Sequence, residues 1–276
     1  GKGIAIDLGG YTAPVGEEDN SNASDNNNTA DNSGNTYEND IDFSLIELNE
    51  QAPMPKGEVS NKENKTGIYS VRVEESGKAS FGSKQMLDKL WGEFSHDMSQ
   101  ELGLGYAEKD LIGNETNAES ILGFIEKAVG EIGEEEFRKR ESEYLYKKKF
   151  EPSITYARDT FPKGTAMTPK VITFIADSAN QHGGVNKITK KVAEELLNNP
   201  DLDPKKENDV LLAFKNARLK YIEGLTAKNT EVTEDLKPSL YKRVNNTYDA
   251  LIGRESESNG KVDSSNGKPI GNDLFL

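Results

Sequence analysis

The chain has 276 residues, enough for one good-sized domain with extensions or for two small ones. Its formal net charge of −14 argues against a nucleic-acid partner, because phosphate backbones are bound by basic surfaces. There is no cysteine, which excludes disulfides, thiol catalysis and cysteine-ligated zinc. No apolar run approaches the roughly 20 residues that span a bilayer, so we expect no membrane span.

Residues 1–66 predict an extended acidic arm. They hold four lysines against 13 Asp and Glu, and positions 20–35 are almost entirely Asn, Asp, Ser, Thr and Gly. Such a segment cannot bury enough apolar surface to offset its ordering entropy. We interpret residues 1–66 as an interaction arm, with a solvated linker as the alternative. One short strand is predicted through Ile4 and Leu8, and Phe43–Leu48 is an apolar island that could dock on the main domain.

Residues 67–253 predict a mainly helical domain. Apolar residues recur at spacings of three and four, which indicates amphipathic helices with faces at Leu87–Leu102, Ile121–Ile132, Ile188–Leu196, Val210–Leu225 and Leu240–Leu251. Thr116 and Glu119 have capping-box spacing. Strand signals are confined to a few residues around Gly67–Val73. Residues 254–276 return to Ser, Asn, Gly and Lys, which is typical of a flexible tail.

Residues 168–184 predict the central helix of this domain. Thr168 suits the N-cap, Pro169 suits the first turn, and Gly183 suits a left-handed C-cap. Apolar residues occupy more than one face of the helix, which indicates that protein surrounds it. Its last turn is polar, as expected of a core helix that delivers side chains to a cleft.

The segment Glu134–Lys149 has the opposite character. It begins acidic and ends basic, with Glu and Arg or Lys repeatedly four residues apart. These pairs and the helix dipole stabilise an exposed helix modestly. We interpret this helix as a solvated face.

The most informative motif lies within Gly67–Met86. Glu74 and Glu75 precede Ser76-Gly77, and a loop then leads through Gly82 and Gln85 into a helix. This order resembles the lysozyme-like murein-cleaving domains, in particular the lytic transglycosylases and muramidases of phage tails. They place a catalytic Glu before Ser-Gly, and a Gly-x-x-Gln-like element and a helix after it. Further on, Ala179–Gly183 resembles an Ala-x-Gln-His-Gly element of some phage relatives, and the resemblance covers about residues 66–253. Arg218 with Tyr221, and Tyr241-Lys242-Arg243-Val244, are loosely similar to the closing helices of phage endolysins.

The resemblance implies a fold, a reaction and a location. The fold would be a lysozyme-like helical domain with a minimal β-lobe at 67–253, between the arm and the tail. The substrate would be the peptidoglycan glycan strand, cleaved at its β-1,4 bonds at the host cell wall or periplasm by a protein of the phage tail or virion. Residues 1–66 would contact other virion or tail proteins. No metal or organic cofactor is implied.

The resemblance also implies roles for particular residues. Glu75 would be the general acid/base, and a carboxyl can hold a proton near neutral pH when apolar surface or a second negative charge surrounds it. A hydrolase needs a second carboxylate as well, whereas a lytic transglycosylase uses one. Candidates for the second are Glu74, Asp177 and Glu101. The side chains that would bind sugar or hold the catalytic loop are Ser76, Gln85, Gln181 and His182.

Simpler interpretations stand beside these. The Glu74-Glu75 pair could be an exposed helix end, His182 a C-terminal cap, and Asp177 the partner of Arg218 or Arg243. Trp91 fits core packing better than sugar stacking. Two histidines without cysteine argue against a zinc site.

The sequence also departs from the family pattern. Only five residues separate Glu75 from Phe81, where lysozyme-like enzymes place a larger β-lobe that forms one wall of the saccharide cleft. A shortened wall favours the main rival, a catalytically inactive lysozyme-like structural virion or cell-wall-binding protein. An unrelated helical scaffold is the third possibility.

Overall fold

The computed structural model describes residues 37–50, 59–60, 67–73, 79–183, 187–227 and 237–253. These residues are mainly helical with a small antiparallel sheet, which confirms the mainly α expectation. The predicted strand at Ile4–Leu8, most of the acidic arm and the tail at 254–276 lie outside the described residues.

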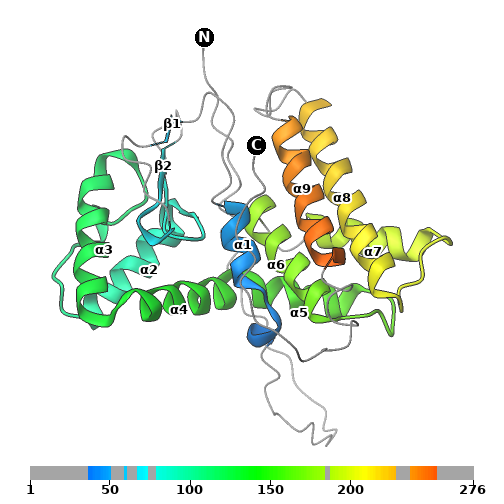
Figure 1. The fold of residues 1–276 in the computed structure, drawn as a ribbon, viewed down its shortest axis with the longest axis horizontal. Coiled ribbons are helices and arrows are strands. Elements are labelled where there is room, and N and C mark those ends of the chain that lie inside the picture. The colour runs from blue at the N-terminus through cyan, green and yellow to red at the C-terminus, as the bar shows by residue number, and fades with distance from the viewer. Residues whose placement is uncertain are drawn as a thin grey trace, which may run out of the picture.

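The helices form two groups with one helix between them (Figure 1). The first group holds α2 (Asp88–Glu101), α3 (Ala118–Ile132) and the sheet. The second holds α5 (Glu151–Thr160), α6 (Pro169–His182), α7 (Ile188–Asn198), α8 (Glu207–Ala227) and α9 (Lys237–Gly253). The helix α1 (Phe43–Glu50) lies between the groups, beside α6.

The helix α4 (Glu134–Leu145) connects the two groups. It continues without a break through a π-helical turn at Tyr146–Phe150 into α5. Short 3-10 turns complete the described helices, at Tyr37–Asp40, Gly67–Tyr69, Glu108–Asp110 and Glu115–Asn117.

The sheet is larger than the sequence predicted. Its strands are β1 (Val59–Ser60), β2 (Val71–Val73), β3 (Ala79–Phe81) and β4 (Met86–Leu87), all antiparallel and in chain order. Val73 pairs with both Val59 and Ala79, so β2 is a central strand. The sheet therefore includes residues 59–60, where the polar composition of the acidic arm gave no strand signal.

The prediction of a central helix at 168–184 is confirmed for its described part. Thr168 caps α6 by accepting the Val171 N–H at 3.4 Å, and Gly183 ends the helix at φ +61°. Every residue from Val171 to Ala179 is buried. The α6 helix contacts the π-turn and the helices α1, α5, α7, α8 and α9.

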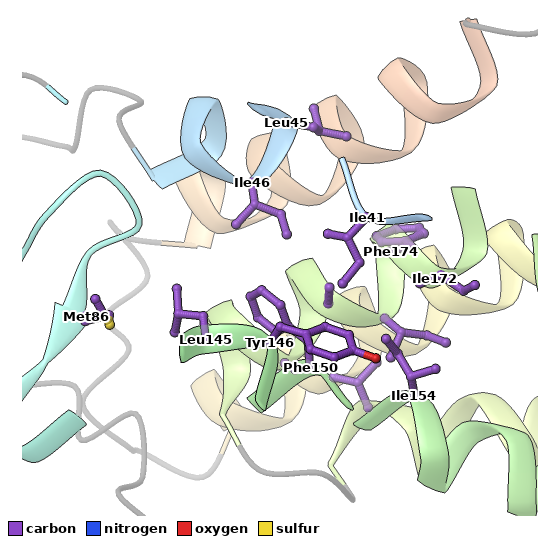
Figure 2. Packing of buried hydrophobic residues seen from close by; sticks show 14 of the residues in the cluster. Ile41, Leu45, Ile46, Met86, Leu145, Tyr146, Phe150, Ile154, Ile172 and Phe174 are labelled. Atoms are coloured by element: carbon purple, nitrogen blue, oxygen red, sulfur yellow. The ribbon is translucent and has the colours of Figure 1, made fainter. Parts of the chain in front are cut away.

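The apolar island in the predicted arm docks on this core as a helix. Leu45 and Ile46 of α1 are buried, and the Phe43 ring lies 6.1 Å from the ring of Phe150. Figure 2 shows the α1 segment packed over side chains of the π-turn and α6, among them Tyr146, Phe150 and Phe174. Residues 37–50 therefore pack on the helical body, which confirms that the apolar island docks on the main domain.

The predicted capping box at Thr116 and Glu119 was wrong. The side chain of Asn114, not that of Thr116, caps the turn before α3 by accepting the Asn117 N–H at 2.9 Å. Thr116 instead donates its hydroxyl to the same Asn114 oxygen at 2.7 Å. The capping box failed because an Asn two residues earlier already satisfies the free amide.

The helix α4 is not simply a solvated face. Two predicted pairs do form, Arg138 with Glu134 at 2.9 Å and Arg140 with Glu136 at 3.0 Å. However, Phe137, Glu141 and Leu145 are fully buried on its other side. Charged residues dominate the sequence of this helix, so the sequence gives little sign of its buried face.

Candidate functional site

Two of the segments that carry the resemblance, the Gly82–Gln85 turn and the end of α6, meet at one place, although almost one hundred residues separate them. The side-chain amide of Asn180, near the end of α6, donates to the Glu50 carboxylate at 2.7 Å and to the Lys84 carbonyl at 3.4 Å. Lys84 belongs to the turn Gly82–Gln85 between β3 and β4. We call Glu50, Arg72, Lys84, Asn180 and Arg243 the junction.

Glu50 is the centre of the junction. Its carboxylate forms an ion pair with Arg243 of α9, and its backbone carbonyl accepts a hydrogen bond from Arg72 of β2 at 2.7 Å. The residue is only 7% exposed, yet its side chain is not completely enclosed. This single carboxylate thus lies where α1, the sheet, the turn, α6 and α9 come together.

A fourth cation lies within electrostatic reach of the junction. Burial lowers the pKa of Lys149 in the π-turn, and the nearby Glu50 carboxylate acts in the opposite direction. The π-helical turn is an uncommon element that occurs frequently at functional sites. The Glu50 carboxylate therefore acts electrostatically on both Lys149 and Arg243.

Gln85 holds the turn together with its own side chain. Its amide oxygen accepts the Ser80 hydroxyl at 2.7 Å, and its amide nitrogen donates to the Gly82 carbonyl at 2.8 Å. The backbone of Gln85 has a φ of +52°, which is costly for a residue other than glycine. Because these contacts lie inside the protein, Gln85 fits the loop-holding alternative rather than contact with sugar.

Beneath the turn lies a buried carboxylate that the sequence did not single out. Glu141 of α4 accepts the Ser83 backbone N–H at 3.1 Å and the Ser83 hydroxyl at 2.7 Å. The Lys84 ammonium lies 3.9 Å from Glu141 and 3.8 Å from Glu47 of α1. Burial raises the pKa of the Glu141 carboxyl, and the Lys84 charge partly offsets that.

Asp177, a candidate second carboxylate, lies in a closed network. It is fully buried, pairs with Arg218 at 2.7 Å and lies 3.6 Å from Arg243. Asn49 and Thr247 donate to its oxygens at 3.2 Å and 3.3 Å. Burial alone would raise its pKa, but the two guanidinium groups outweigh it and lower the pKa. The predicted pairing with Arg218 or Arg243 is therefore confirmed, and it occurs with both.

Gln181 and His182 face the same buried arginine. The Arg218 guanidinium donates to the His182 Nε2 atom at 3.2 Å and contacts the Gln181 side-chain oxygen. Both side chains are buried. Burial and the charges of Arg218 and Arg243 hold the pKa of His182 well below its usual value. Gln181 and His182 therefore fit the alternative role of structural residues, which attach the end of α6 to Arg218 of α8.

The remaining predicted residues fall into two sets. Glu74, Glu75 and Ser76 lie outside the described residues. Glu101 is exposed at the end of α2, where it pairs with Arg140 at 2.8 Å. Trp91 is fully buried, with its ring centroid within 6.5 Å of Phe81, Phe94 and Phe124, which confirms its core role.

Sequence reasoning missed Glu50. The signal was present, because the apolar island ends in the polar pair Asn49-Glu50 and a proline follows three residues later. Assignment of the whole segment to the acidic arm concealed it. The buried role of Glu141 had no such signal, since Glu141 and the half-exposed Glu143 have similar neighbours in the sequence.

Other sites in the described residues offer less. A hollow of about 470 Å³ between α7 and α8 is lined mostly by charged and amide side chains, with Pro200 and Ala217, and by none of the predicted site residues. Within the described ranges, no three His, Asp or Glu gather closely enough to hold a metal ion. No described helix has the length and apolar character needed to cross a membrane.

Comparison with known proteins adds no family. No protein-family model matches the chain, and the search of curated proteins found no match.

Proposed function

We propose that this chain cleaves the β-1,4 glycan strands of peptidoglycan with a lysozyme-like domain, and that Glu50 is the catalytic carboxyl. In this proposal the chain acts at the host cell wall as part of a phage tail or virion, and residues 1–66 contribute contacts to that assembly. The observation that carries the proposal is the junction. The Gly82–Gln85 turn and the end of α6, on which the resemblance rests, meet at Asn180, and Asn180 binds Glu50.

The position of the sheet supports Glu50 over Glu75. Lysozyme-like enzymes place a β-lobe between the catalytic carboxyl and the Gly-x-x-Gln element, and Glu75 leaves only five residues before Phe81. With Glu50, the strands β1, β2 and β3 all lie between the carboxyl and the turn. Three strands therefore lie in the chain where the resemblance expects the wall of a cleft, which supports Glu50 over Glu75.

The contacts of Glu50 suit a carboxyl that must be oriented before reaction. Asn180 and Arg243 hold the same carboxylate oxygen, Oε1. To act as general acid, Glu50 must first take up a proton from solvent, so in this proposal bound sugar displaces the Arg243 guanidinium and the protonated carboxyl then donates to the glycosidic oxygen. A single carboxyl then suffices for lytic transglycosylation, in which it returns as base while a sugar hydroxyl attacks. This agrees with the closed surroundings of Asp177 and the distant place of Glu101.

Digestion of purified murein by the full chain tests the function. We expect soluble fragments, whose mass also identifies the reaction, because transglycosylation leaves anhydro ends and hydrolysis leaves reducing ends. Binding to murein without release of fragments would refute cleavage and support the inactive cell-wall-binding rival. If the chain neither binds murein nor releases fragments from it, the result would support the third possibility, an unrelated helical scaffold.

A further inference from the structure

The buried carboxylate of Glu141 holds the turn from below. One of its oxygens accepts the Ser83 backbone N–H at 3.1 Å and the other accepts the Ser83 hydroxyl at 2.7 Å. Ser83 is completely buried, and its hydroxyl also accepts a hydrogen bond from the Lys84 ammonium at 2.9 Å. A charged group in this place is costly unless its hydrogen bonds are satisfied, so α4 and the turn are tightly coupled.

The fit between Glu141 and the turn leaves no free space. A Cβ atom on Gly82 would lie 2.0 Å from a Glu141 carboxylate oxygen and 3.0 Å from the Trp91 ring. The turn therefore rests directly on the Glu141 carboxylate. Any change in the length or hydrogen bonding of the Glu141 side chain shifts the turn or leaves a void.

A short series of contacts leads from Glu141 to the proposed catalytic carboxyl. Glu141 holds Ser83, the next residue Lys84 offers its carbonyl to Asn180, and Asn180 binds Glu50. The turn thus transmits the position of α4 to the amide that orients Glu50. Displacement of a reacting group by about 1 Å can cost roughly 100-fold in rate.

We infer that Glu141 is a positioning residue for the catalytic carboxyl, acting through Ser83 and the Lys84 carbonyl on the contact between Asn180 and Glu50. This inference rests on the proposed function for its consequence in catalysis. Its structural part, the coupling of Glu141 to Asn180, does not depend on that function.

The test compares Glu141→Gln with Glu143→Gln in the full chain. Glu143 is on the same helix but half-exposed, so it controls for the loss of one charge. We expect Glu141→Gln to lower kcat on soluble murein fragments by roughly 10- to 100-fold with KM nearly unchanged, and Glu143→Gln to leave both unchanged. Unchanged kcat in a folded Glu141→Gln variant would overturn the inference.

A double-mutant cycle separates positioning from general weakening. Ser83→Ala removes the hydroxyl partner, and its effect on kcat should not add to that of Glu141→Gln, because both break one path. Additive losses would overturn the path through Ser83. If Glu141→Gln fails to fold, Ser83→Ala tests the same expectation of a reduced kcat. An unchanged kcat in Ser83→Ala would then overturn the positioning role of Glu141.

A measurement without substrate distinguishes the two possible failures. The side-chain amide resonance of Asn180 in ¹⁵N-labelled protein should shift in Glu141→Gln and stay in place in Glu143→Gln. If the wild-type chain leaves murein intact while Asn180 still shifts, the proposed function is wrong and the coupling stands. If murein is cleaved but neither kcat nor Asn180 responds to Glu141→Gln, the positioning role is wrong and the function stands.

Discussion

The side-chain amide of Asn180 donates to the carboxylate of Glu50 at 2.7 Å, although the two residues are 130 positions apart in the chain. This contact joins a helix from the predicted arm to the last turn of the central helix. It makes α1 part of the candidate site, and it identifies a carboxyl that the sequence motifs alone do not.

Replacement of Asp177 should destabilise the fold severely. Asp177→Asn removes the negative charge that Arg218 and Arg243 share, and leaves the fully buried Arg218 guanidinium without its carboxylate partner, whereas Arg243 keeps Glu50. Loss of one partner of a buried ion pair costs about 3–5 kcal/mol of unfolding free energy. Urea denaturation measures this, with Glu143→Gln as a control that should hardly move the midpoint. A variant as stable as the wild type would show that the network contributes little.

Stability should depend on pH through His182. Because its folded pKa is lowered, the unfolded chain binds a proton near pH 6.5 that the native protein does not. The unfolding free energy should therefore decrease as pH falls from about 6.5 toward the lower folded pKa, and be largest above that window.

Variants at the two histidines test this pH dependence. His182→Gln, which cannot take up that proton, should flatten the decrease in urea melts between pH 7 and pH 5. His96→Gln leaves His182 in place, so this variant should keep the decrease in unfolding free energy between pH 7 and pH 5. An unchanged slope in His182→Gln would assign the pH dependence to other groups.

Gly82 should not tolerate a side chain, for two separable reasons. Gly82→Ala places a methyl group against Glu141 and also adopts a left-handed backbone at φ +81°. Gly105 has a φ of +76° but open space around it, so Gly105→Ala measures the backbone strain alone. Such strain costs about 1–2 kcal/mol, and overpacking adds roughly 1–3 kcal/mol. Equal losses in the two variants, by thermal or urea melts, would mean that Glu141 moves aside freely.

The sequence predicted the helical framework well because its signals are local. The spacing of apolar residues, the cap at Thr168 and the stop at Gly183 all act within a few positions, and the structure confirms each of them. The pairing of Asp177 with arginine was also accessible, since a charge in an apolar helix requires a partner. Trp91 lay on a clear apolar stripe and is buried as expected.

The candidate site was harder to predict because it depends on contacts between distant segments. Glu50 looks like one more acidic residue of the arm until α1 docks on α6. Glu141 differs from Glu143 only in facing Ser83, which is 58 positions away. The strand at Val59–Ser60 likewise exists through its pairing with β2, which no local pattern announces.

The most direct measurement of the central claim compares Glu50→Gln with Glu75→Gln in release of dye-labelled fragments from murein, with near-UV circular dichroism to confirm folding. Loss of a general acid lowers the rate by at least about 100-fold. We predict that Glu50→Gln loses at least this much while Glu75→Gln retains most of the wild-type rate. An active Glu50→Gln variant, or an inactive Glu75→Gln variant beside it, would contradict the assignment of Glu50 as the catalytic carboxyl.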